Sequence, residues 1–102
     1  MYKLVVTELA HEDLDNIVSY IAVQLKSPRA ATNFLADVER CYKFLISNPL
    51  MYEQCNDPRL RSENYRKVTI NNCVLIYKFD ESAGAVTVYR FFYGAQNHAY
   101  LL

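Results

Sequence analysis

The sequence predicts an α+β fold in which a helical hairpin packs on one face of a mostly antiparallel four-stranded sheet. The expected element order is β-α-α-β-β-β, and a single domain is expected over residues 1–102. Two observations support this prediction. Apolar residues in the first half of the chain recur every three to four positions, which is the period of an amphipathic helix. Residues 65–93 contain three runs rich in Val, Ile, Thr, Tyr and Phe, separated by short polar breaks, as in consecutive antiparallel strands.

Composition and charge narrow the class of protein. Hydrophobic residues make up 52% of the 102 residues and charged residues 22%, which is typical of a globular domain. Net charge is zero, but residues 1–58 carry five Lys/Arg against eight Asp/Glu, whereas residues 59–102 carry six against three. A dedicated nucleic-acid binder usually has a clearly basic balance, and this chain has a pI near 6.7. With no apolar run of membrane length and no leader pattern, we expect a cytoplasmic protein without a membrane partner.

The first half of the chain begins with a short strand that runs into a helix. Residues 2–6 form the apolar run that predicts the strand, and Thr7 is a plausible N-cap with Glu8 in the first turn. A helix is expected over residues 8–25, with one apolar stripe formed by Leu14, Ile17, Val18, Ile21 and Leu25. Four polar residues lie off this stripe and are expected to face water, namely Glu12, Asp13, Asp15 and Asn16.

The second helix has a clear start and end. Ser27 is a capping residue and Pro28 suits the first helical position, because its φ is already set. Asn48-Pro49 ends the helix. Its apolar stripe consists of Ala31, Phe34, Leu35, Val38, Cys41, Tyr42 and Leu45. The two helices are joined by a few residues and form a hairpin whose stripes need the sheet as a partner. Residues 50–64 show no clean period and are interpreted as a connecting segment.

The remaining strands carry basic residues in their interiors, which indicates that one face of the sheet meets water. Asn71-Asn72 suits a two-residue hairpin turn, because Asn tolerates positive φ. Alternation gives Arg66 the face of Val68 and Ile70, so Lys67 is expected on the wet face.

The last strand places Arg90 on the face of Val86, Val88 and Phe92, provided that alternation is regular. Arg90 is then either partly buried and paired with a carboxylate, or it marks the point where this face opens. Tyr89, Phe91 and Tyr93 are expected to share the other face. Such an aromatic row is more often core or a partner groove than a stack for nucleic-acid bases.

Three cysteines, Cys41, Cys55 and Cys73, are widely spaced and odd in number. They match neither a disulfide framework nor a zinc pattern, so free thiols are expected. We expect no metal and no cofactor.

Several segments together resemble the RelE/ParE superfamily of toxins from bacterial type II toxin–antitoxin systems. The resemblance covers essentially the whole chain. It includes the Ser-Pro-x-x-Ala-x-x-Phe opening of the second helix and its Asn-Pro end. The most specific segments are Tyr65-Arg66-Lys67, Leu75-Ile76-Tyr77-Lys78-Phe79 and Val88-Tyr89-Arg90-Phe91-Phe92-Tyr93-Gly94. Family members commonly show an Arg in the last strand, then an apolar pair, then His-Gly or Tyr-Gly.

The resemblance implies a growth-inhibiting toxin, a cognate antitoxin as partner, and either DNA gyrase or ribosome-bound mRNA as target. In the RNA-cleaving RelE branch a basic cluster does the chemistry and includes an Arg in the middle strand. The matching position here is Val74, with Ile76 two residues on, and neither can serve. After Gly94, where the family usually carries a basic pair and an acid, this chain has Ala95-Gln96-Asn97.

The candidate site residues follow from this comparison. Catalysis, if present, falls to Lys67, Arg90, His98 and Tyr100, whereas Arg59, Arg61 and Arg66 are candidates for binding nucleic acid or the target. The incomplete basic set favours a ParE-like action on gyrase. A RelE-like mRNA endonuclease and a non-catalytic antitoxin-binding module are the alternatives.

Overall fold

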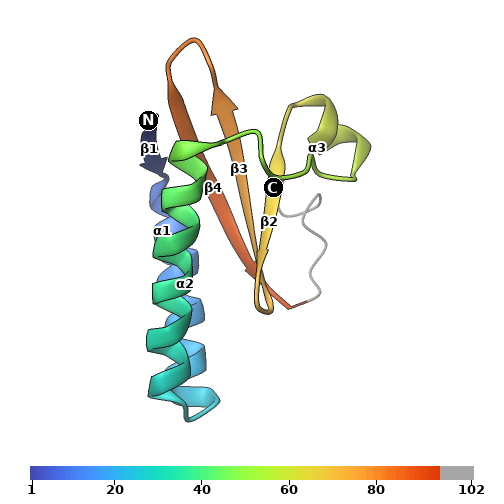
Figure 1. The fold of residues 1–102 in the computed structure, drawn as a ribbon. Helices are drawn as coiled ribbons and strands as arrows, with labels where there is room; N and C mark the ends of the chain where they lie inside the picture. The colour runs from blue at the N-terminus through green and yellow to red at the C-terminus, as the bar shows by residue number, and fades with distance from the viewer. Residues whose placement is uncertain (95–102) are drawn as a thin grey trace.

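The computed structural model describes residues 1–94 and has the expected order of strands and long helices (Figure 1). Its elements are β1 (Lys3–Val6), α1 (Glu8–Ser19), the π-helix η1 (Tyr20–Gln24), α2 (Pro28–Ser47), α3 (Pro58–Ser62), β2 (Arg66–Ile70), β3 (Cys73–Asp80) and β4 (Ala85–Tyr93).

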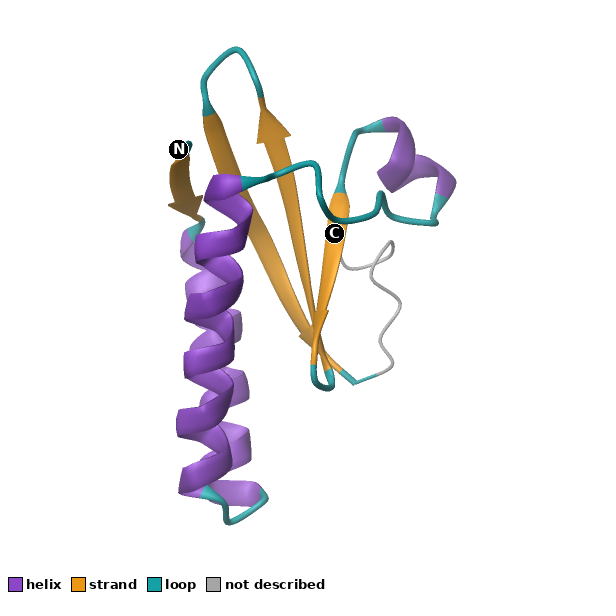
Figure 2. Ribbon diagram, viewed as in Figure 1, coloured by secondary structure: helices purple, strands orange, loops and turns teal. Residues whose placement is uncertain are grey.

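The four strands form one sheet in the order β1-β4-β3-β2. β1 pairs with β4 in parallel, while β4 with β3 and β3 with β2 pair antiparallel. The helical hairpin lies along one side of this sheet (Figure 2). Asn71 forms part of the β2–β3 turn with a φ of 54°, as the Asn-Asn sequence predicts. The predicted fold class is therefore confirmed.

Both long helices begin at the residues that the sequence indicates. The Thr7 side chain accepts a hydrogen bond from the Ala10 amide, and the Ser27 side chain accepts one from the Ala30 amide, with Pro28 in the first turn. Their stripes pack on the sheet in one large core, whose most buried members include Ala10, Val38, Leu45, Cys73, Leu75, Tyr77, Val86 and Val88.

Two residues of the predicted stripes do not belong to this core. Leu25 is 49% exposed and Leu35 is 39% exposed. The predicted helix over residues 8–25 passes into the π-helix at Tyr20, whose turns contain more residues than α-helical turns. A stripe spaced for an α-helix therefore loses its phase before Leu25, which explains the wrong prediction there.

The connecting segment also differs from its prediction, because it contains the one-turn helix α3. Asp57 caps this helix by accepting hydrogen bonds from the Arg59 and Leu60 amides, and Pro58 occupies its first turn. The segment covers the sheet on the side opposite the hairpin. There Cys55, Leu60, Ile76 and Phe92 form a second, smaller core with Tyr65 and Val74 at its border. The face expected to meet water is thus partly buried.

Candidate functional site

A β-bulge in β4 sets the direction of the candidate residue Arg90. Ile76 pairs with Arg90 and the next residue of β3 pairs with Val88, so Tyr89 is the extra residue in β4. The bulge shifts the alternation of side chains by one position. Arg90 shares a face with Phe92, as predicted, and its guanidinium lies 4.7 Å from the centroid of the Phe92 ring. Its predicted place on the face of Val86 and Val88 is wrong, since both pack in the helix-side core.

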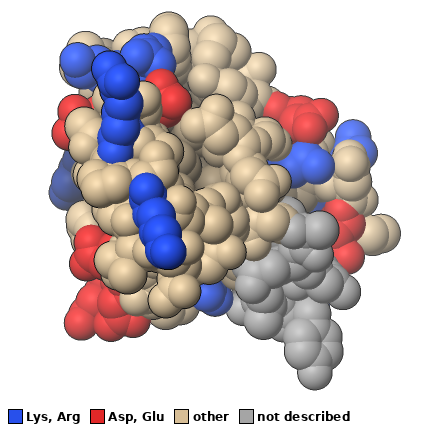
Figure 3. Space-filling view, turned by 90° about the horizontal axis from the view of Figure 1, so that it is seen from below, with Lys and Arg blue, Asp and Glu red and all other residues tan. Residues whose placement is uncertain are grey.

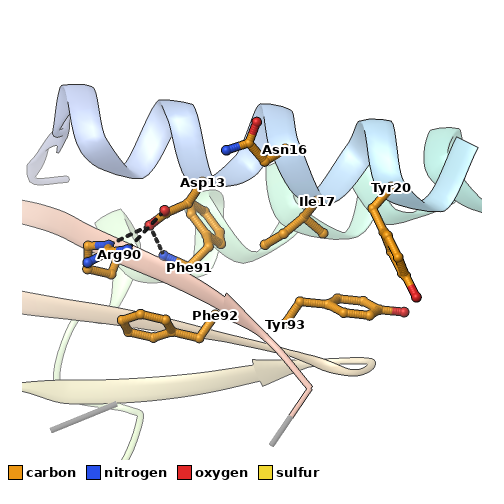
Figure 4. Close-up of a pocket in the computed structure, with 8 residues that line it drawn as sticks. All are labelled: Asp13, Asn16, Ile17, Tyr20, Arg90, Phe91, Phe92 and Tyr93. Atoms are coloured by element: carbon orange, nitrogen blue, oxygen red, sulfur yellow. Dashed lines mark hydrogen bonds and ion pairs between the residues drawn. The ribbon is translucent and has the colours of Figure 1, made fainter. Parts of the chain in front are cut away.

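Arg90 is paired with Asp13 of α1 (Figure 4). The Arg90 Nε donates to Asp13 Oδ2 at 2.6 Å, and Arg90 Nη2 donates to Asp13 Oδ1 at 3.1 Å. The side chains are 18% and 14% exposed, respectively. This bidentate geometry is the strong form of an ion pair. Of the two roles considered for Arg90, the paired one is confirmed.

Asp13 also accepts a backbone hydrogen bond from the part of the β4 edge that β1 does not reach. β1 ends at Val6, so β4 has no strand partner on that side beyond Val88. The amide of Thr7 donates to the Val88 carbonyl and the Thr7 hydroxyl to the Tyr89 carbonyl, both at 3.1 Å. The Phe91 amide then donates to Asp13 Oδ2, also at 3.1 Å. The backbone amide and hydroxyl of Thr7 and the carboxylate of Asp13 therefore satisfy the edge of β4 where pairing with β1 stops.

The sequence prediction that Asp13 faces water is wrong. The missed signal was its position between Ala10 and Ile17, both buried, at spacings of three and four on the same helix. An acidic residue at such a spacing has to meet a partner inside the molecule.

The two described members of the predicted catalytic set, Lys67 and Arg90, lie in one row across the sheet. The register pairs Lys67 with Ile76 and Ile76 with Arg90. Ile76 is therefore the middle-strand residue between the two cations, and the predicted position, Val74, is one row away, opposite Phe92. Ile76 is fully buried in the smaller core. An apolar side chain thus separates the two cations.

Lys67 is on the face away from the hairpin, as alternation predicts, but it is only 25% exposed. Its Nζ lies 3.7 Å from Glu53 Oε1. Burial raises the pKa of the neighbouring Cys55 thiol, while the charge of Lys67 acts in the opposite direction. Both Lys67 and Arg90 consequently have a carboxylate beside them.

Of the three arginines predicted to bind a target, Arg59 and Arg61 lie on α3 and Arg66 begins β2. Arg66 Nη1 donates to the Tyr52 carbonyl at 2.7 Å. Arg59 forms a salt bridge with Glu63 at 3.0 Å on α3, and Arg61 is exposed on the same helix. Arg66 is next to Lys67 in β2 but pairs with Tyr77 of the hairpin-side core, whereas Lys67 pairs with Ile76 of the smaller core. His98 and Tyr100 lie outside the described residues.

The bulge also divides the aromatic residues of β4. Tyr89 lies away from the face of Phe91 and Tyr93, with its ring 5.5 Å from that of Tyr65. The Lys78 ammonium is 4.2 Å from the centroid of Tyr65 and 5.8 Å from that of Tyr89. This arrangement is a cation–π contact within the chain. The prediction of one aromatic row is therefore wrong at Tyr89.

The three thiols are free, as predicted, and all three are buried. Burial raises the pKa of Cys41 to about 11 and that of Cys73 to about 12. Within residues 1–94, no group of three or more His, Cys, Asp or Glu side chains could hold a metal ion. In the same part of the chain, no helix has the length and apolarity needed to cross a membrane.

Comparison with solved structures identifies relatives of the fold. The chain is similar to a structure of the chromosomal ParDE toxin–antitoxin system from P. aeruginosa, with a TM-score of 0.72 and 20% identity over 93% of this chain and 98% of that one. It is also similar to the RelBE2 toxin–antitoxin complex of Mycobacterium tuberculosis, with a TM-score of 0.64 and 20% identity over 90% and 96% of the two chains. The intact E. coli RelBE complex matches with a TM-score of 0.58 and 16% identity, over 95% and 100%.

Sequence comparison gives the family. A search of curated proteins finds no match. The family model described as the ParE toxin of the type II toxin–antitoxin system parDE matches residues 4–98, which is nearly the whole chain. The chain therefore belongs to the ParE toxin family of type II toxin–antitoxin systems.

Proposed function

We propose that this toxin inhibits growth through a ParE-like action on DNA gyrase and that a cognate antitoxin neutralises it in the cytoplasm. The observation that carries the choice of target is the row Lys67–Ile76–Arg90. RNA cleavage needs a base, an acid and cations around the phosphate that is being transferred. In this row the middle position is buried isoleucine, and each outer cation is beside a carboxylate.

The Asp13–Arg90 pair argues further against phosphate binding at this place. Its two charges compensate each other, and both side chains are largely buried. A phosphate approaching Arg90 would meet the carboxylate of Asp13 at short range, where the low dielectric makes like charges repel strongly. Loss of one preorganised charge-stabilising group from an active site commonly costs about 100-fold in rate. A site without its middle cation and with a second one neutralised is a poor nuclease.

Long-range electrostatics point in the same direction. The net charge is zero and the pI is near 6.7. Attraction to the phosphate-rich surface of a ribosome depends on net positive charge. Binding to a protein target does not require a net positive charge. The antitoxin is proposed because the similar solved structures are toxin–antitoxin complexes, ParDE and RelBE.

The test combines growth with two purified assays. Expression in a bacterium should slow growth, and co-expression of the protein encoded next to the toxin gene should restore it. The purified toxin should inhibit supercoiling by gyrase and should not cleave mRNA on ribosomes. Normal growth at confirmed soluble expression would instead favour a non-catalytic antitoxin-binding module.

The choice between the two targets is tested with variants in the row. Lys67→Ala removes one cation, and the double variant Asp13→Asn with Arg90→Gln removes the other without leaving a buried charge unpaired. Lys43→Ala, at an exposed position on α2, is the matched control. Strong mRNA cleavage that is lost in the first two variants and kept in the control would overturn the gyrase assignment.

A further inference from the structure

An exposed apolar surface lies at the end of the molecule where the N-terminus, the end of α2 and the β3–β4 turn come together (Figure 1). We call it the turn-end surface and define it by Tyr2, Leu50, Met51 and Phe79. The first three are 39%, 57% and 49% exposed, respectively. The rings of Tyr2 and Phe79 are 4.8 Å apart, and the Tyr2 amide donates to the Ile46 carbonyl at 2.9 Å. These contacts join the N-terminus to β3 and to the end of α2.

The backbone that carries Leu50 and Met51 is fixed by hydrogen bonds. The Pro49 carbonyl accepts a buried hydrogen bond from the Tyr77 hydroxyl at 2.6 Å. The Met51 amide donates to the Asn48 carbonyl at 3.1 Å, which closes a turn directly after α2. The exposure of these two neighbouring apolar side chains is therefore set by an anchored turn. An apolar patch that the fold keeps in contact with water is typical of an interaction site.

The border of this surface carries charges of both signs. Lys3 and Glu81 are exposed, and neither forms an ion pair within residues 1–94. The Lys3 amide donates to the Gly84 carbonyl at 2.9 Å, so Lys3 lies beside the β3–β4 turn that contains Glu81. The neighbouring carboxylate of Asp80 is used inside this turn, where it accepts a hydrogen bond from the Ser82 hydroxyl at 2.8 Å. Lys3 and Glu81 therefore remain available to a partner.

This arrangement of charges is complementary to itself. In a twofold contact each surface meets its own copy, so Lys3 of one protomer lies opposite Glu81 of the other, and the reverse. A partner with a surface of one sign would attract one of these side chains and repel the other. The net charge of the chain is zero, so two copies do not repel each other at long range. Met and aromatic side chains, such as those of this surface, are enriched in protein interfaces.

We propose that the turn-end surface binds a second copy of this chain in a twofold dimer. The apolar side chains of the two copies pack together at the centre of the contact, and reciprocal pairs of Lys3 with Glu81 form its border. Exposed ion pairs contribute little and the surface is small, so the dimer is reversible, with a Kd in the micromolar range. The inference does not depend on which target the toxin inhibits.

Sedimentation equilibrium of the purified full chain measures the Kd of this dimer. Lys3→Glu and Glu81→Lys, made singly, each place like charges opposite each other at two symmetric positions. Each should therefore weaken the dimer about tenfold. The double variant Lys3→Glu with Glu81→Lys exchanges the two charges and should restore the Kd of the unaltered toxin.

The apolar centre is tested with Leu50→Ser combined with Met51→Ser. Both positions are exposed, so the fold should stay intact, which thermal unfolding followed by circular dichroism reports. Four apolar side chains leave the contact, two from each copy. We therefore expect the Kd of the dimer to rise about a hundredfold.

Two control substitutions lie at the opposite end of the molecule, the free end of the hairpin, which faces the viewer in Figure 3. Val23→Ser alters an apolar side chain of η1 that is 64% exposed. Arg29→Glu makes the same change in net charge as Lys3→Glu, at an exposed position in the first turn of α2. Both controls should keep the Kd of the unaltered toxin.

The outcomes separate this inference from the proposed function. An unaltered toxin that stays monomeric up to its solubility limit would overturn the dimer. An unchanged Kd in the variant of Leu50 and Met51, or equal losses in the controls, would overturn its location at the turn-end surface. A double charge variant that does not regain the dimer would overturn the pairing of Lys3 with Glu81. If the toxin is monomeric and the variant of Leu50 and Met51 no longer inhibits gyrase, the surface faces the target, and the dimer is wrong while the proposed function stands.

Discussion

The two faces of the sheet are covered in very different ways. On one face, the two long helices bury a large core that includes Phe34, Leu45 and Val88. On the other, a loop and the one-turn helix α3 bury only a small cluster around Ile76. The loop is fixed to the edge of β2 by the Cys55 amide on the Tyr65 carbonyl and the Lys67 amide on the Glu53 carbonyl, at 2.9 and 3.1 Å. The first face stabilises the fold, and the second decides which cations remain accessible.

The largest effect is expected on the hairpin side. Phe34 is 3% exposed, so Phe34→Ala should lower the free energy of unfolding by about 3–5 kcal/mol through lost burial and a residual cavity. Urea denaturation measures this change. Leu35→Ala, at the exposed neighbouring position, should cost less than about 1 kcal/mol. Equal losses at the two positions would contradict the assignment of the core face.

The next largest effect is expected at Asp13, which contacts both Arg90 and the backbone edge of β4. Asp13→Ala removes the partner of Arg90 and the acceptor of the Phe91 amide, and it should cost about 2–3 kcal/mol. Asp13→Asn retains an oxygen for the Phe91 amide and should lose less. Denaturation of both variants at the same pH provides the comparison. An unchanged stability in Asp13→Ala would mean that the pair contributes nothing net.

A smaller loss is expected in the second core. Leu60 is 2% exposed, but its surroundings are a loop and a one-turn helix that can collapse around a shortened side chain. Leu60→Ala should therefore cost about 2 kcal/mol, the lower end of the range for such changes. The hairpin should stay intact, which the hydrogen-exchange protection of α1 and α2 would report. A loss as large as that of Phe34→Ala would mean that the two cores are one cooperative unit of equal weight.

The smallest effect is a pH dependence that also distinguishes the cores. Burial raises the pKa of Cys41 to about 11 and that of Cys73 to about 12 from an ordinary value of 9.0. Above pH 9 the unfolded chain releases these protons first, so the free energy of unfolding falls as pH rises. At pH 10 the loss should be about 1 kcal/mol per thiol.

The matched variants for this measurement are alanine substitutions of the thiols. Cys73→Ala should flatten the decline in the free energy of unfolding between pH 9 and pH 10. Cys55→Ala, in the small core, should change the slope less, because the charge of Lys67 opposes the effect of burial on that thiol. If the free energy of unfolding fell more steeply with pH in Cys73→Ala than in the unaltered protein, another group would control the loss of stability above pH 9.

The two faces of the sheet also differ in how well the sequence predicts them. The caps at Thr7 and Ser27 and the Asn-Asn turn are local signals that are present in the structure, and helix periodicity holds except at Leu25 and Leu35. The second core was missed because burial on both faces removes the alternation that marks a half-exposed strand. Leu75, Ile76 and Tyr77 are consecutive and all fully buried. The segment that covers Ile76 shows no apolar periodicity. Only the capping residue Asp57 followed by Pro58 could have indicated its short helix.

The site was less predictable than the fold, since it depends on non-local register. The placement of Lys67 and Arg90 in one row, on either side of Ile76, required the pairing of three strands. The partner of Arg90, Asp13, lies 77 residues away in sequence. Strict alternation assigned Arg90 to the wrong face because a bulge cannot be read from the residues of β4 alone. The presence of a carboxylate partner was foreseen as one of two possibilities, but its identity was not.

The extra residue in β4 has a consequence for how this family can change during evolution. Before Tyr89, the even-numbered residues Val86 and Val88 of β4 face the helices. After Tyr89, the odd-numbered residues Phe91 and Tyr93 face them. A deletion or insertion of one codon at this place, with no substitution anywhere, would exchange the sides on which one part of the strand displays its residues. Members of the family with identical strand motifs but a different length at this position would then show different chemistry on the same face. Alignments that force a gap-free match through this strand would conceal that difference.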